Sequence, residues 1–130
     1  MQRASVYSGA PWEKTVGYCR AKRVGNFIAV SGTTAVAPGG AIHGAGDLYA
    51  QTREAIAIIA RALDELGANL RHVVRTRTFL TDMSRFDDFA RAHHEAFAGI
   101  DPAATCVEVS RLAAPELLVE IEVDAILDAG

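Results

Sequence analysis

DLYAQTREAIAIIARALDELG, residues 47–67, carries the clearest secondary-structure pattern in the chain. Apolar or small residues recur there every three or four positions, which is the spacing of one helix face. These residues are Leu48, Thr52, Ala55, Ile56, Ile59, Leu63 and Leu66. Asp47 is a typical N-cap, and Gly67 is a typical residue after a helix end. The stretch therefore predicts a long helix with one face buried in a core.

Strand patterns flank this helix on both sides. Upstream, Phe27–Ser31 is a short apolar run, and we expect residues 18–24 to pair with it through a turn at Gly25-Asn26. Residues 37–46 contain four glycines and one proline, which predicts a connecting loop. Downstream, His72–Leu80 is rich in β-branched residues, which favours a strand with one polar face.

A second helix and two further strands follow. Ser84-Arg85-Phe86-Asp87 resembles a capping box, which predicts a helix that begins there and ends before Gly99. Its expected apolar stripe consists of Phe86, Phe89, Ala90, His93 and Phe97. Residues 105–109 and 118–123 alternate as strands do. The predicted fold is a single α+β domain over residues 1–130, ordered β-β-α-β-α-β-β, with a mixed sheet and both helices on one face.

Alternation along the last two strands predicts which side chains face the helices. We expect the following residues to lie beneath the helices: Val107, Val109, Val119, Ile121 and Val123. The opposite sheet face would then carry Ala104, Cys106, Glu108, Glu120 and Glu122. Arg75 and Arg77 are predicted to pair with these glutamates across the strands. Such a face fits either water or a polar interface between subunits.

Composition argues against several classes of protein. The 130 residues are half apolar and carry a net charge of −3 without any basic run, which does not favour nucleic acid as a partner. No stretch approaches the roughly 20 apolar residues of a membrane span, and the first residues lack the apolar core of a signal peptide. We therefore expect a cytoplasmic protein without a membrane partner. Cys19 and Cys106 lack a CxxC spacing, so neither a disulfide framework nor a metal site is predicted.

Three segments together resemble the RidA/YjgF family of reactive-intermediate deaminases, which is also labelled endoribonuclease L-PSP. They are GNFIAVSG at 25–32, VVRTRTFLTDM at 73–83, and PAATCVEVSRL at 102–112 continuing to VEIE at 119–122. The resemblance spans about residues 17–126. It implies a chorismate-mutase-like subunit, three of which join their sheets into a barrel with the helices outside. This homotrimer would hold a small-molecule cleft at each subunit boundary.

The resemblance also implies a chemistry. Family deaminases hydrolyse enamines and imines to a keto acid and ammonia without a metal or organic cofactor. An arginine clamps the substrate carboxylate and an acidic residue handles the attacking water. The acidic position falls on Glu120, but the arginine position falls on Ala104. An alanine cannot donate, and a hydrogen bond to a charged group typically contributes about 1.5 to 3 kcal/mol. The chain is therefore interpreted as a divergent member with altered substrate specificity.

Five other residues fall on cleft positions of the family. Tyr18 is carried over beside Glu120 as a catalytic candidate, while Ser31, Gly32, Thr105 and Cys106 are carried over, with Ala104, as substrate-binding candidates. Four of them have a plainer alternative: Tyr18 as a packing residue, Ser31 and Gly32 as a strand end, and Cys106 as an inert thiol.

Charged and titratable residues near these positions have alternatives as well. His93 on the stripe of the second helix is read mainly as a hydrogen-bonded core histidine. Arg75 or Arg77 could replace the missing guanidinium instead of pairing with glutamates. His93, His94 and Glu95 are adjacent in sequence, so they do not share the helix face that a metal site needs.

Two hypotheses for function remain open. The first is a metal-free hydrolase or deaminase of small imines or related carbonyl compounds, in which Glu120 positions water. The second is a non-catalytic module that binds a small metabolite in the same cleft, and Ala104 motivates it. Ribonuclease activity, which the family label suggests, is not favoured by the acidic balance of the chain.

Overall fold

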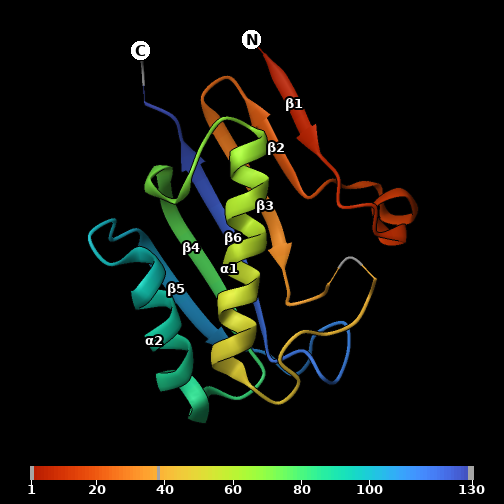
Figure 1. Ribbon diagram of the computed structural model, residues 1–130, viewed down its shortest axis with the longest axis vertical. Helices are drawn as coiled ribbons and strands as arrows, with labels where there is room; N and C mark the ends of the chain where they lie inside the picture. The colour runs from red at the N-terminus through yellow and green to blue at the C-terminus, as the bar shows by residue number, and fades with distance from the viewer. Residues whose placement is uncertain (1, 38, 129–130) are drawn as a thin grey trace.

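The computed structural model describes residues 2–37 and 39–128 (Figure 1). Within these ranges the chain forms a sheet, two long helices and three short helical turns. The strands are β1 (Arg3–Val6), β2 (Ala21–Val24), β3 (Phe27–Thr33), β4 (Val73–Leu80), β5 (Ala103–Glu108) and β6 (Val119–Ile126). The helices are η1 (Glu13–Gly17), α1 (Leu48–Glu65), η2 (Leu70–His72), η3 (Met83–Arg85) and α2 (Phe86–Phe97).

The six strands lie in the order β1-β2-β3-β6-β4-β5. All neighbours are antiparallel except β4 and β5, which are parallel and joined through α2. The last strand, β6, inserts between β3 and β4. Both α1 and α2 lie against the same face of the sheet (Figure 1), so the predicted mixed α+β arrangement is confirmed. We call the other face of the sheet the open face.

Helix α1 forms as its sequence pattern predicts. The Asp47 carboxylate accepts a hydrogen bond of 2.9 Å from the Ala50 amide, and Gly67 has a positive φ of 85° just after the helix. Ile59 and Leu63 are fully buried against the sheet. The turn at Gly25-Asn26 also forms as predicted and joins β2 to β3. Apart from residue 38, which lies outside the described ranges, residues 37–46 form the predicted connection, with one bridge between Val36 and Ile42.

The N-terminal segment differs from the prediction. Strand β1 was not predicted, and β2 begins at Ala21 rather than at Tyr18, because the short helix η1 occupies residues 13–17. Glu13 is buried and accepts hydrogen bonds from the Ser8 amide at 3.0 Å and the Ser8 hydroxyl at 2.7 Å. Burial raises the pKa of Glu13, but these bonds, the Gly9 amide and nearby Arg20 outweigh it, and the net pKa lies below 4.5.

The predicted start of the second helix is wrong. Asp82, not Ser84, caps the segment, and its carboxylate accepts from the Ser84 amide at 3.0 Å and the Ser84 hydroxyl at 2.6 Å. The turn η3 precedes α2, which begins only at Phe86 and has no side-chain cap at Arg85. Aspartate outcompetes serine because an ionised acceptor makes the stronger hydrogen bond to an amide.

The predicted orientation of β5 is wrong as well. Cys106 packs against the core beneath α2, and Ala104 lies on the same side, whereas Val107 is 42% exposed on the open face. Glu108 is not on the open face, because its carboxylate accepts from the Met83 amide at 2.8 Å and it pairs with buried Leu80. Alternation divides the side chains of a strand between two faces, but it does not say which face a helix covers. Here α2 packs against the face that carries the small side chains.

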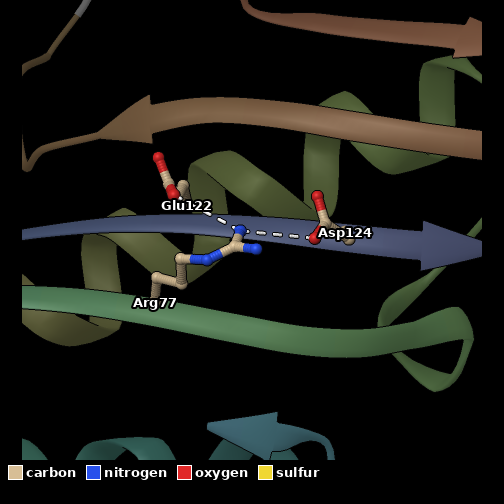
Figure 2. Close-up of polar contacts among 3 residues, drawn as sticks. All are labelled: Arg77, Glu122 and Asp124. Carbon is tan, nitrogen blue, oxygen red and sulfur yellow. Dashed lines mark hydrogen bonds and ion pairs between the residues drawn. The ribbon is translucent and has the colours of Figure 1, made fainter. Parts of the chain in front are cut away.

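The open face carries a short charge cluster (Figure 2). Arg77 of β4 approaches Glu122 at 3.4 Å and Asp124 at 3.3 Å, both on β6. The predicted pairing of Arg77 with a glutamate is confirmed for Glu122, and Asp124 is an additional partner. Within the described ranges Arg75 forms no ion pair. Since these groups are partly exposed, the pairs contribute at most about 1 kcal/mol each.

Candidate functional site

An irregularity in β3 positions Ser31 and Gly32. Val30 pairs with Val123 and Thr33 pairs with Ile121, so Ser31 and Gly32 together oppose a single residue of β6. We call this feature the β3 bulge. A bulge bends its strand and redirects side chains, and bulges are frequent beside functional sites.

Ser31 is held by the segment before β2. Its hydroxyl donates to the Cys19 carbonyl at 2.7 Å, and its amide donates to the Arg20 carbonyl at 2.9 Å. Both of its donors are therefore used within the chain, and only the lone pairs of the hydroxyl oxygen are left for a ligand. Arg20 in turn donates from Nη2 to the Gly32 carbonyl at 2.6 Å, which fixes the guanidinium beside the β3 bulge.

Glu120 lies directly against Gly32. A β-carbon added to Gly32 would overlap the Glu120 carboxylate oxygen Oε2 and would stand 2.9 Å from Cδ. The absence of a side chain at Gly32 thus provides the space that the carboxyl group occupies. Glu120 itself is half-buried and points to the open face, because its neighbours Val119 and Ile121 are fully buried.

The surroundings of Glu120 raise its pKa above that of an ordinary glutamate. Burial raises the pKa of Glu120, Arg20 lowers it, and the like charge of Glu122 raises it further, so that the net pKa lies above 4.5. A carboxyl group with a raised pKa can exchange a proton with a substrate or water nearer to neutral pH than an ordinary glutamate does. This is the electrostatic setting of a general acid or base.

Tyr18 and Ser31 line a large hollow on the open face. It has a volume of about 1210 Å³ and extends from the N-terminal segment to the charge cluster of Arg77, Glu122 and Asp124. Glu120 does not line this hollow. The structure therefore places Tyr18 on the same face as Glu120 without showing a contact between them.

The remaining predicted residues border a cleft at the opposite face of the sheet, although Thr105, in register with Arg77, belongs to the open face. Ala104, Thr105 and Cys106 line a cleft of about 560 Å³ between α2 and strands β4 and β5, which we call the α2 cleft. Within one chain, Glu120 and the β5 residues are thus not brought together. Strand β4 lies between β6, which carries Glu120, and β5, and the α2 cleft is on the other side of the sheet from Glu120.

Two titratable groups border the α2 cleft. Burial raises the pKa of the Cys106 thiol, which keeps it protonated and makes it a poor nucleophile. The Nε2 atom of His93 lies 3.0 Å from the Thr76 hydroxyl, which confirms the predicted hydrogen-bonded histidine. Burial lowers the pKa of His93 from 6.5, so its ring is uncharged at neutral pH.

Other classes of site receive no support from the described residues. Among them, no group of three His, Cys, Asp or Glu side chains is placed to hold a metal ion. No helix in the described ranges combines the length and the apolar character that crossing a membrane requires.

A protein-family model and solved structures show which protein family the chain belongs to. The family model described as Endoribonuclease L-PSP matches residues 9–127. The chain belongs to this family. The crystal structure of Rv2704 from Mycobacterium tuberculosis, a member of the YjgF/YER057c/UK114 family, is similar to this chain, with 44% identity and a TM-score of 0.88 over 97% of this chain and 100% of that one.

Curated relatives support the same membership. An uncharacterized protein of Streptomyces coelicolor is 38% identical over 92% of this chain and 89% of its own length. A RutC family protein of Pyrococcus abyssi is 37% identical over 84% of this chain and 86% of its own. The resemblance of the sequence to the RidA/YjgF family is thereby confirmed, and so is the match of the sheet and two helices to L-PSP structures.

Sequence reasoning missed one residue of this L-PSP family protein that contacts the site. Arg20 was not predicted, because an isolated arginine before a strand carries no periodic signal. The guanidinium group reaches the Gly32 carbonyl and the neighbourhood of Glu120 only in the folded chain. The sequence offers no signal that singles out Arg20, because Lys22 and Arg23 follow it within three positions.

Proposed function

We propose that this protein hydrolyses a small imine, or the enamine that forms it, to a carbonyl compound and ammonia. Water would add to the carbon of the C=N bond while the Glu120 carboxylate accepts a proton from that water. Glu120 would pass this proton to the nitrogen, which gives a carbinolamine. The carboxylate would then take the proton of the new hydroxyl group and deliver it to the nitrogen as the C–N bond breaks, so that ammonia leaves and the carbonyl compound remains. The half-buried Glu120 carboxyl group, seated on Gly32 with a raised pKa, is the observation that carries the proposal.

Membership in the L-PSP family supports a small-molecule-binding or deaminase-like function. The reaction as proposed needs no metal or organic cofactor, because water and one carboxyl group balance it. We expect the substrate to differ from the family's usual 2-imino acids, because position 104 holds alanine instead of arginine. The chain is in this sense proposed to be a divergent member of the family.

The active assembly is proposed to be a homotrimer. In one chain the two groups of candidate residues lie on opposite faces of the sheet, so a complete cleft requires a second subunit. Val107, 42% exposed on the open face, is suited to such an interface. We expect light scattering to give three times the 13.8 kDa of one chain, and a monomer at micromolar concentration would contradict the assembly.

A non-catalytic metabolite-binding module is the second candidate. It is favoured by the α2 cleft, which has no lysine or arginine among its lining residues to orient an acidic substrate. RNA is not favoured as a partner, since the net charge is −3 without a basic run.

Ammonia release distinguishes the two candidates. Imines generated from different amino acids and amines would be supplied to the wild-type protein, with a protein-free sample as the control for spontaneous hydrolysis. The proposed hydrolase is expected to accelerate ammonia release from at least one of them. Stabilisation against thermal unfolding by a compound of this set, without faster ammonia release from any, would assign the binding module instead.

A further inference from the structure

We propose that the α2 cleft binds an uncharged ligand that has an apolar or aromatic end and one hydrogen-bonding group, and that it disfavours carboxylates. This inference rests on the proposed function in one respect, because Ala104, which lines this cleft, is the residue from which an altered substrate was proposed there. The binding preference itself does not depend on catalysis.

One wall of the α2 cleft is a row of aromatic rings along α2. The ring centroids of Phe86 and Phe89 lie 5.7 Å apart, those of Phe89 and His93 lie 5.3 Å apart, and those of His93 and Phe97 lie 4.7 Å apart. Their sequence spacing of three or four residues places the four rings on one helix face. Such a wall offers an apolar surface and ring edges to a flat ligand.

The other wall is built from small side chains. Thr76 and Thr78 of β4 pair in register with Ala104 and Cys106 of β5, and all four line the cleft. All four side chains are short, and they line the cleft opposite the rings of α2. The volume of about 560 Å³ falls within the range of small-molecule sites.

The charges around the cleft oppose an anion. No lysine or arginine is found among its lining residues, and the one acidic residue there is Asp101. The His93 ring is uncharged at neutral pH, because burial lowers its pKa. A carboxylate entering the cleft would lose water without a lysine or arginine to pair with, and it would approach Asp101, so both effects raise its free energy.

One buried hydroxyl group that borders the cleft lacks a hydrogen-bond partner among the described residues. Thr76 and Thr78 are both almost fully buried. The Thr76 hydroxyl is paired with His93, but the Thr78 hydroxyl has no hydrogen-bond partner in the part of the chain that the structure describes. An unpaired buried hydroxyl is unfavourable, and a ligand carbonyl, imine or amide that pairs with it removes this penalty. Thr78 is therefore the expected polar anchor.

Two probes of similar shape, one neutral and one anionic, test the inference. Phenylacetamide and phenylacetate have the same ring and nearly the same size, and their binding to the wild-type protein at pH 7.5 is measured by calorimetry. The amide is expected to bind about tenfold or more tightly than the acid, since only the acid enters as an unpaired charge. Equal or tighter binding of phenylacetate would overturn the inference, and so would the absence of amide binding at millimolar concentration.

Variants identify the residues responsible. Ala104→Arg adds a cation at an exposed position of the cleft and is expected to reverse the preference, so that phenylacetate binds more tightly than the amide. Ala41→Arg places the same charge on an exposed loop residue that does not line the cleft, and it should leave the preference unchanged. Thr78→Val keeps the shape of the side chain but removes its hydroxyl group. This variant is expected to bind phenylacetamide about fivefold or more weakly. If the Ala104→Arg variant still preferred phenylacetamide to the same degree, the assignment of the α2 cleft as the binding site would be contradicted.

The outcome separates this inference from the proposed hydrolysis. Selective binding of the amide, with no ammonia release from any imine, would support the cleft assignment and reject the reaction. Hydrolysis of carboxylate-bearing imines, with no preference for the amide, would support the reaction and reject the cleft assignment.

Discussion

Replacement of Glu120 by glutamine is expected to lower kcat/KM for imine hydrolysis by about 100-fold or more. Glutamine has the shape of glutamate and still fits above Gly32, but its amide cannot accept a proton from water. General acid–base catalysis typically contributes 10² to 10⁴ in rate, which sets the expected loss. Initial rates of ammonia release by wild-type and Glu120→Gln proteins, at equal concentrations of folded protein, provide the measurement.

Glu122→Gln is the matched control. Glu122 lies two residues further along β6 on the same face, but its carboxylate pairs with Arg77 at 3.4 Å instead of lying on Gly32. We expect this variant to keep kcat/KM within a few-fold of wild type. If both substitutions reduced the rate equally, the carboxyl group of Glu120 would have no special part in the reaction.

The pH dependence follows from the same surroundings. Glu120 acts as a base in its ionised form, and burial raises its pKa above 4.5, so activity should fall as the pH drops through this raised value. Arg20→Met removes a cation that lowers the pKa, which shifts the acidic limb to higher pH. Glu122→Gln removes a like charge and shifts the limb to lower pH. An acidic limb at or below 4.5 in the wild-type protein would contradict the role of Glu120.

Local pattern predicted the parts of the fold that depend on nearby residues. Helix α1, its Asp47 cap and the turn at Gly25-Asn26 are all specified within a few residues of sequence. Strand β1 escaped prediction because four residues in Arg3–Val6 give too little alternation, and its pairing with β2 is what makes it a strand. The face of β5 was wrong because its choice depends on how α2 packs, which alternation does not contain.

In the candidate site, too, the residues could be predicted from the sequence, but the contacts between distant segments could not. Resemblance to the family placed Glu120, Gly32 and Ala104 at defined positions, but it did not predict the contact between Glu120 and Gly32. That contact depends on the β3 bulge, which arises from the register between two strands that are almost 90 residues apart in sequence. The role of Arg20 on the Gly32 carbonyl likewise requires the hairpin to be folded.

Substitution of Gly32 by alanine is expected to lower kcat/KM on the order of 100-fold while leaving the melting temperature nearly unchanged. The added methyl group would overlap Oε2 of Glu120, so the carboxyl group has to move. Because the atoms in conflict are at the end of a flexible side chain, the fold can accommodate the methyl group at low cost in stability. A displacement of about 1 Å at the reacting group can cost about 10²-fold in rate.

The control is Gly39→Ala, because a β-carbon at Gly39 would meet open space and Gly39 does not have the positive φ that would strain an alanine. Both variants are compared with wild type by ammonia release and by thermal unfolding. Full activity in Gly32→Ala would show that turnover does not depend on the position of the Glu120 carboxyl group against Gly32. A large loss of melting temperature would instead make Gly32 a requirement of the fold. The expected loss of rate without a loss of stability therefore ties the β3 bulge to the chemistry of Glu120.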